Sequence, residues 1–178
     1  MAAGRGSDPA VQAMKDLDLR FRPAEERDAA IIGALRREIW GTTYRGIYPD
    51  EVIDRFDVEG HLRRDLGRIA DPAFRVWVIE DGERPIGYLY LERRTGVHIQ
   101  SLYVLREYQG RGIGRAAFAL VRDCCRAWGL ESFTCCCNAH NAPARGFYEH
   151  QGGVLIGTDT GHENRQEDQV TYRFHTEE

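Results

Sequence analysis

The chain has 178 residues, a formal net charge of −4 and a pI of about 5.9; 42% of its residues are hydrophobic and 29% are charged. These values describe an ordinary globular domain with enough chain to bury a core. The acidic balance argues against a dedicated nucleic-acid-binding protein, because such proteins are usually basic. The sequence has neither a run of about 18 apolar residues nor an apolar signal-peptide core, so we expect a cytoplasmic protein.

The N-terminal part of the chain predicts a leader, an edge strand and three helices. Residues 1–17 are small and polar, and we expect them to form a flexible leader before one domain over residues 18–178. "LRFRPA" (19–24) alternates apolar and basic residues, which favours an edge strand. "EERDAAIIGALRREIW" continues with helical spacing, and the glycines and proline of "GTTYRGIYPDE" are expected to break that helix. Further helices are predicted after Pro49 and over residues 57–69.

The rest of the chain predicts a meander followed by alternating helices and strands. "FRVWVIE", "PIGYLYLERR" and "VHIQSLYV" are rich in β-branched and aromatic residues and predict three antiparallel strands joined by short turns. Apolar residues at helical spacing predict a helix over about 112–128 that stops at Gly129. "SFTCCC", "VLIGTDT" and "QVTYRFH" predict later strands. "NAPARGFYEHQGG" predicts a short helix with Asn141 as its N-cap.

The five cysteines are clustered and odd in number, which is a poor pattern for disulfide bonds. We interpret "FTCCC" as a buried strand in a reducing compartment, where free cysteines act as small apolar residues. Cys135 and Cys137 would share one face of that strand. No histidine or aspartate nearby completes a tetrahedral set of ligands, so no metal is expected.

A glycine-rich segment, "EYQGRGIGRAAF", lies between the last strand of the meander and the next helix. Its glycines occupy positions 110, 112 and 114, although glycine is a poor helix former. The first amides of a helix have no partner inside it, and they lie at the positive end of the helix dipole. Glycines let a ligand approach these amides, and Arg111 and Arg115 add positive charge. The segment therefore predicts an anion site, most often one for phosphate.

Three kinds of phosphate ligand fit such a loop. A nucleoside triphosphate requires G-x-x-x-x-G-K-[ST], and the lysine followed by serine or threonine is missing here. A dinucleotide site is suggested by G-x-G-x-x-A from Gly112 to Ala117. However, "LREYQ" separates strand from loop, and no acidic residue ends the next strand. The third candidate is coenzyme A, whose pyrophosphate requires the same cradle.

The segment "LYVLREYQGRGIGRAAF" closely resembles the acetyl-CoA signature of the GCN5-related N-acetyltransferases, Gln/Arg-x-x-Gly-x-Gly/Ala, met here by Gln109 through Gly114. "NAHNAPARGFYEHQGG" resembles the second motif of that family, with Asn141 followed seven residues later by Tyr148. The resemblance covers roughly residues 19–175 and implies an α/β (α+β) fold. Its central sheet would be mixed, mostly antiparallel, of about six to seven strands, and flanked by helices. The strands at 97–104 and 132–137 would splay apart in a V.

The resemblance also implies an acetyl-CoA site without a metal. Pantetheine would lie in the V against backbone groups of β-strand residues 102–104, and the pyrophosphate would rest on the glycine-loop amides. Asn141 would touch the pantetheine arm and also cap its helix. The implied cofactor-binding residues are Leu102, Tyr103, Val104, Gln109, Gly110, Arg111, Gly112, Ile113, Gly114, Arg115 and Asn141.

Catalysis in this family implies that an amine attacks the acetyl carbonyl and that coenzyme A leaves as a thiolate. Tyr148 would donate a proton to the sulfur as a general acid. A backbone amide near Val104 could stabilise the oxyanion. Two positions that often hold glutamate in relatives are His98 and Cys136 here. His98 is a candidate base near neutral pH, and Cys136 is interpreted as a core residue.

We therefore predict an acetyl-CoA-dependent N-acetyltransferase that acts on a primary amine, with a homodimer expected only from the resemblance. The alternatives are a peptide or protein N-acetyltransferase and a non-catalytic acyl-CoA-binding module. A small or flexible cationic acceptor is favoured by an acidic segment at 38–59, because negative charge attracts an ammonium ion. Aromatic side chains in the same segment could bind it through their faces; they are Trp40, Tyr44 and Tyr48.

Overall fold

The structure is a computed structural model that describes residues 17–177. Except for residue 17, the predicted leader lies outside these residues. The described residues form one seven-stranded sheet in the order β1-β2-β3-β4-β5-β7-β6. Its strands are β1 (Leu19–Pro23), β2 (Phe74–Asp81), β3 (Arg84–Glu92), β4 (His98–Val104), β5 (Ser132–Asn138), β6 (Val154–Asp159) and β7 (Gln169–His175).

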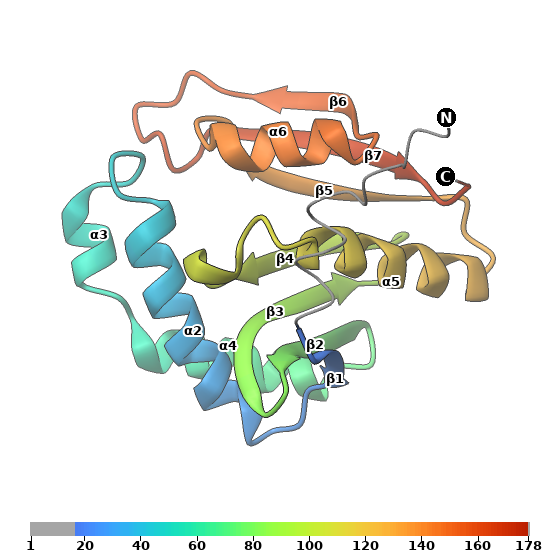
Figure 1. The fold of residues 1–178 in the computed structure, drawn as a ribbon. Helices are drawn as coiled ribbons and strands as arrows, with labels where there is room; N and C mark the ends of the chain where they lie inside the picture. The colour runs from blue at the N-terminus through green and yellow to red at the C-terminus, as the bar shows by residue number, and fades with distance from the viewer. Residues whose placement is uncertain (1–16, 178) are drawn as a thin grey trace, which may run out of the picture.

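All neighbouring strands are antiparallel except β4 and β5, so the predicted meander and the predicted mixed sheet are both confirmed. β1 lies at one edge, as its alternating sequence predicted. Helices cover both faces of the sheet (Figure 1). They are α2 (Asp28–Thr43), α3 (Asp50–Asp54), α4 (Val58–Ala70), η1 (Arg106–Tyr108), α5 (Ile113–Ala127) and α6 (Ala142–His150).

Two clusters of buried side chains hold the layers together. On one face, α2 contributes Ile32, Leu35 and Ile39 to a core with β2 and β3. On the other face, α5 contributes Phe118 and Val121 to a core with β5 and β7. Burial of apolar area on both faces provides the main stabilisation of such a sheet.

The first long helix ends within the segment that was predicted to break it. The glycines and the proline of residues 41–51 were expected to interrupt the helix, and α2 includes Gly41 and ends at Thr43, where the amide of Tyr44 still donates to the carbonyl of Trp40 at 3.1 Å. Trp40 and Tyr44 pack edge to face, with ring centroids 5.5 Å apart. This packing outweighs the helix penalty of one glycine, which is about 1 kcal/mol.

A buried ion pair fixes α2 against α4. The guanidinium of Arg36 donates to both carboxylate oxygens of Asp65 at 2.5 and 2.8 Å. The hydroxyl of Tyr90 donates to the same carboxylate at 2.9 Å. Removing either partner would leave a buried charge without compensation. The pair therefore holds α2 against α4 and β3 at this point.

β4 and β5 separate after a short contact, which confirms the predicted V. Only His98↔Thr134 and Ile99↔Cys135 are paired between them, and the two strands diverge beyond these pairs (Figure 1). The divergence begins at a bulge in β4. Tyr90 pairs with Ser101 and Leu91 pairs with Ile99, so Gln100 has no counterpart on β3. A bulge bends and twists its strand, which here directs β4 away from β5.

Within residues 17–177, no helix is both long and apolar enough to cross a membrane.

Candidate active site

A cavity of about 670 Å³ lies in the V between β4 and β5. Its walls come from the end of α2, the second half of β4, the glycine loop, the start of α5, the middle of β5 and one side of α6. Of the eleven predicted cofactor-binding residues, all except Arg111 line this cavity: Leu102, Tyr103, Val104, Gln109, Gly110, Gly112, Ile113, Gly114, Arg115 and Asn141.

Each of the three glycines in the loop is required by a different physical constraint. Gly110 and Gly112 have φ angles of 75° and 84°, a left-handed conformation that other residues rarely adopt. Gly114 has ordinary helical geometry, but a Cβ atom there would lie 2.7 Å from the ring of Phe147 on α6. The first two glycines therefore shape the loop, and the third lets α5 approach α6 closely.

The loop presents the N-terminus of α5 to the cavity. Gly112 is the N-cap of this helix, and it makes no side-chain cap hydrogen bond. The first amides of α5, at Ile113 and Gly114, lie at the positive end of the helix and can donate to an anion. The side chain of Gln109 is turned away from them, because it donates to the carbonyl of Val104 at 3.1 Å. This bond ties the loop to the end of β4.

The edge of β4 that faces the cavity can receive an extended ligand. Beyond Ile99, residues of β4 have no strand partner on the β5 side within the described chain. Leu102, Tyr103 and Val104 pair only with β3 on the opposite edge. Unpaired strand groups bind an extended chain as an additional strand would.

α6 brings two predicted site residues to the same cavity. Asn141 caps this helix, since its side-chain oxygen accepts the amide of Ala144 at 3.2 Å. The N-cap prediction is therefore confirmed. Tyr148 lies on the inner face of α6 and is 8% exposed. Burial and the nearby thiols of Cys135 and Cys137 raise the pKa of Tyr148 well above its usual value, so the phenol stays protonated.

The end of α2 closes the cavity with a pair of tyrosines. The hydroxyl groups of Tyr44 and Tyr103 are hydrogen-bonded at 2.6 Å, which joins α2 to β4. Tyr44 also stacks on Tyr48, with ring centroids 4.3 Å apart. Trp40 packs against both rings, and its buried indole nitrogen has no hydrogen-bond partner among the described residues. Tyr44 lines the cavity, whereas Trp40 supports it from behind.

A second cavity, of about 640 Å³, opens beside the first, and both are lined by Ile47. One wall is the α2–α3 connection, from residue 46 to Asp50. The other wall is the connection between β6 and β7, with Glu163, Asn164 and Arg165. These two connections face each other at the upper left of Figure 1. We call this second cavity the mouth.

Comparison with known proteins decides the family. Residues 34–153 match the acetyltransferase (GNAT) family, which is more than half of the chain. The chain belongs to this family. It is therefore an acetyltransferase enzyme, and the predicted resemblance and enzyme class are confirmed.

Individual relatives agree with this assignment. The chain is 26% identical over 153 residues to the "Probable N-acetyltransferase Rv2775" of Mycobacterium tuberculosis, covering 81% of this chain and 84% of that protein. The PaiA N-acetyltransferase of Thermoplasma acidophilum, solved with coenzyme A, has a TM-score of 0.78 and 20% identity, with 88% and 98% of the two chains covered. A chimera of the spermidine N-acetyltransferase SpeG of Vibrio cholerae has a TM-score of 0.66 and 20% identity, with 89% and 95% covered.

The structure of this GNAT enzyme places His98 at the closed end of the V. Its Nδ1 atom lies 2.8 Å from the hydroxyl of Thr134, and burial lowers the pKa of the ring. Among the described residues, His98 lines neither the cavity in the V nor the mouth.

We expect His98→Ala to reduce turnover only mildly, because the ring lines neither cavity and so does not contact a bound amine directly. The dependence of kcat on pH should keep its shape. A Thr134→Val variant, which removes the partner of His98, serves as the control for packing changes at this end of the V. A loss beyond about 10²-fold, with a shift of the limb in which the rate rises with pH, would make His98 the base.

Cys136 corrects the interpretation of the cysteine strand. Cys135 is buried and Cys137 is half-buried, but Cys136 is exposed and lines the cavity. Its sulfur lies 3.2 Å from the hydroxyl of Thr171. Strand alternation explains the difference, since Cys135 faces the core beneath α5 and Cys136 faces the opposite side.

Sequence reasoning missed the β6–β7 connection as part of the site. Its residues Glu163, Asn164 and Arg165 lie far along the chain from the α2–α3 connection that they face. A polar loop carries no periodicity that would indicate its partner. Its histidine and its aspartate, His162 and Asp168, were however a local signal of polar anchoring.

Proposed function

We propose that this enzyme transfers the acetyl group of acetyl-CoA directly to a primary amine, and that the amine is small or flexible and cationic. The observation that carries the proposal is the meeting of three features in one cavity. They are the glycine-loop amides, the unpaired edge of β4 and the side chain of Tyr148. A pyrophosphate, an extended amide arm and a departing sulfur require such groups in this order.

The residues present fit coenzyme A. The amides of the glycine loop and of the start of α5 would hold the pyrophosphate, and the free edge of β4 would pair with the pantetheine amides. The side-chain oxygen of Asn141 already accepts the amide of Ala144 in the cap of α6, so its side-chain nitrogen is the group that can contact the pantetheine arm. Nothing in this set resembles a metal site, and we propose none.

Direct transfer assigns one step to each group. The amine nitrogen attacks the acetyl carbon, the carbon–sulfur bond breaks, and the electron pair leaves on sulfur. Tyr148 would supply a proton to that sulfur, and an amide near Val104 would hold the developing oxyanion. Water in the mouth would take the proton that the acceptor ammonium must lose before its nitrogen can attack, because neither predicted base position offers a carboxylate at the cavity.

The mouth supports a cationic acceptor, but its acidity is weaker than the sequence predicted. Arg45 donates to Asp50 at 2.9 Å and to Asp54 at 2.5 Å, and Asp57 caps α4. Of the acidic residues predicted at the entrance, only Asp50 lines the mouth, where Glu163 faces it from the opposite wall. Asp50, Asp54 and Glu163 against Arg45 and Arg165 leave a net charge of −1.

Enzymes with this fold are named for different acceptors, so the acceptor of this enzyme must be identified by experiment. One such enzyme is named for spermidine, and another for the N-terminus of the ribosomal protein L7/L12. Purified protein should be offered acetyl-CoA with diamines, polyamines, amino acids and free-N-terminal peptides. Thiol release and the mass of the product are the readouts. Binding of acetyl-CoA without turnover on any amine would indicate a non-catalytic binding module instead.

Two neighbouring acids on α3 test the charge of the mouth. Asp50→Asn should lower kcat/KM for the acceptor about fivefold at low salt, the effect of about 1 kcal/mol from one partly screened charge. Glu51→Gln removes the same charge from the next residue, which does not line the mouth, and should have a smaller effect. The KM for acetyl-CoA should stay unchanged in both variants.

Salt provides the second arm of this test. Added salt should lower kcat/KM for the acceptor in the wild-type enzyme and less so in Asp50→Asn. A preferred acceptor that is neutral or anionic, or a kcat/KM that ignores salt, would contradict the cationic acceptor.

A further inference from the structure

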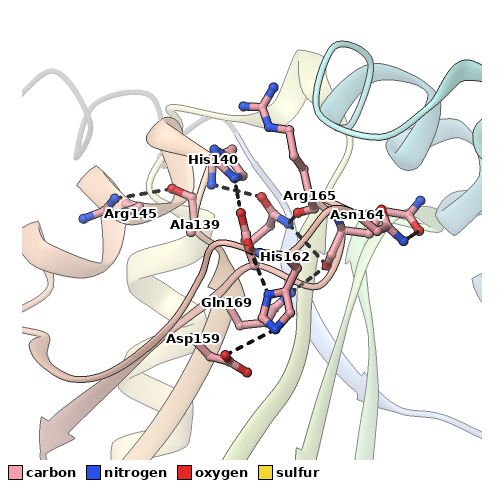
Figure 2. Close-up of polar contacts among 11 residues, drawn as sticks. Ala139, His140, Arg145, Asp159, His162, Asn164, Arg165 and Gln169 are labelled. Atoms are coloured by element: carbon pink, nitrogen blue, oxygen red, sulfur yellow. Dashed lines mark hydrogen bonds and ion pairs between the residues drawn. The ribbon is translucent and has the colours of Figure 1, made fainter.

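The connection between β6 and β7 is anchored by a buried carboxylate between two histidines (Figure 2). Asp168, which directly precedes β7, is 4% exposed. Its Oδ2 atom accepts a hydrogen bond from Nε2 of His140 at 2.6 Å, and its Oδ1 atom accepts one from Nδ1 of His162 at 2.9 Å. The backbone amide of His162 also donates to Oδ1, at 3.1 Å. One carboxylate therefore holds both ends of the loop against α6.

Asn138, at the end of β5, provides a second anchor. It is 2% exposed, and its side-chain nitrogen donates to the carbonyl of Arg165 at 2.7 Å. Its side-chain oxygen accepts the amide of His140 at 2.9 Å. The backbone carbonyl of Asp168 in turn accepts the amide of Ala139 at 2.9 Å. Two buried polar residues thus fix the loop backbone on both sides of Arg165.

The charges around Asp168 favour this arrangement. Hydrogen bonds from His140 and His162 lower the pKa of Asp168, and the bond to Asp168 raises the pKa of His162. His162 also lies 3.4 Å from Asp159 on β6. A carboxylate with two such donors stays ionised and forms charge-assisted bonds, which are stronger than neutral ones.

The anchored loop belongs to two parts of the site at once. Its outer residues, from Glu163 to Arg165, form one wall of the mouth. Its inner contact, His140, directly precedes Asn141, the N-cap of the helix that carries Tyr148. Asp168 itself lines neither cavity among the described residues, so it can act on a substrate only through the groups it holds.

We propose that Asp168 is a positioning residue for the acceptor: it holds the wall of the mouth from Glu163 to Arg165 at a fixed place relative to Tyr148. The inference rests on the proposed function, because it takes the mouth to be the acceptor site. Loss of the carboxylate releases the loop from both histidines. The acceptor then meets a mobile wall, while the glycine loop and β4 keep their geometry.

Asp168→Asn tests this with a residue of the same shape. The KM for the acceptor should rise about tenfold to a hundredfold, the usual effect of losing charge-assisted hydrogen bonds. The KM for acetyl-CoA, and its affinity measured by calorimetry, should stay within about twofold. Amides from residue 161 to 167 should exchange hydrogen faster, while those of α6 should not.

Asp159→Asn is the matched control. Asp159 also contacts His162, but its side chain is exposed and does not reach His140. This variant should leave both KM values unchanged. If Asp168→Asn does not fold, His140→Gln and His162→Gln remove one contact each and should each raise the KM for the acceptor.

Two outcomes separate this inference from the proposed function. A wild-type enzyme that acetylates no amine would overturn both. A wild-type enzyme that acetylates an amine, with a folded Asp168→Asn variant whose two KM values are unchanged or rise together, would overturn only the positioning role.

Discussion

Tyr148→Phe should lower turnover by about 10²–10⁴-fold, the usual contribution of a positioned acid. The phenylalanine ring keeps the packing against Phe118 and Tyr172, whose ring centroids lie 6.0 and 5.9 Å away. Only the hydroxyl is lost, and with it the proton for the departing sulfur. Affinity for acetyl-CoA should therefore barely change, which calorimetric titration can measure.

The raised pKa of Tyr148 also predicts how turnover depends on pH. Burial keeps the phenol protonated beyond its ordinary range near pH 10, so the acid form is present at every working pH. Ionisation of Tyr148 should therefore cause no fall of kcat as the pH rises to about 10. A fall near pH 8 that disappears in Tyr148→Phe would contradict this assignment.

Tyr172→Phe is the control for the loss of a nearby hydroxyl. This phenol donates to Glu149 at 2.9 Å, and Tyr172 does not line the cavity among the described residues. The turnover of Tyr172→Phe should match that of the wild type.

Both variants should be measured in single-turnover experiments, because slow product release would hide the chemical step. A single-turnover rate for Tyr148→Phe within a few-fold of wild type would exclude Tyr148 as the acid.

Gly112→Asp should abolish binding of coenzyme A. Two unit charges about 4 Å apart, at an effective dielectric constant of about 20, interact with about 4 kcal/mol, and a repulsion of this size lowers affinity by about three orders of magnitude. Gly112 has a φ of 84°, so any side chain there also strains the loop. Strain must therefore be separated from charge.

Gly112→Asn makes that separation. Asparagine has the shape of aspartate, and both tolerate left-handed backbone better than most residues. The two variants should unfold at similar temperatures, yet only Gly112→Asp should lose coenzyme A. A substrate without the pyrophosphate, S-acetylpantetheine, should bind both variants alike. Equal affinity of the two variants for coenzyme A would mean that the pyrophosphate lies elsewhere.

Local signals made most of the fold predictable. Helical spacing, strand alternation and turn residues depend on near neighbours, so the meander, the edge strand and the cap at Asn141 could be read directly. The glycine motif was only partly local, because Gly110 and Gly112 satisfy backbone requirements within one loop, whereas Gly114 makes room for Phe147 on α6. The V itself was implied by the resemblance and not by any single strand.

Contacts between distant segments could not be predicted. The place of Tyr44 at the cavity depends on its hydrogen bond to Tyr103 on β4, 59 residues further along the chain. That Cys136 borders a cavity depends on the separation of β5 from β4 in the V, which no local pattern indicates. The wall of the mouth depends on Asp168 and Asn138, which hold a polar loop without any repeating pattern.

The unpaired residue Gln100 has a consequence beyond the bend it introduces. Strict alternation would put Ile99, Ser101 and Tyr103 on one face of β4. Because Gln100 adds one residue, Ile99 faces the core beneath α5, whereas Tyr103 pairs with Tyr88 and faces α2, where it reaches Tyr44. A single inserted residue thus exchanges one face of the sheet for the other in the half of the strand that borders the cavity. One residue more or fewer at the bulge would turn the side chains between it and the glycine loop to the opposite face of the sheet.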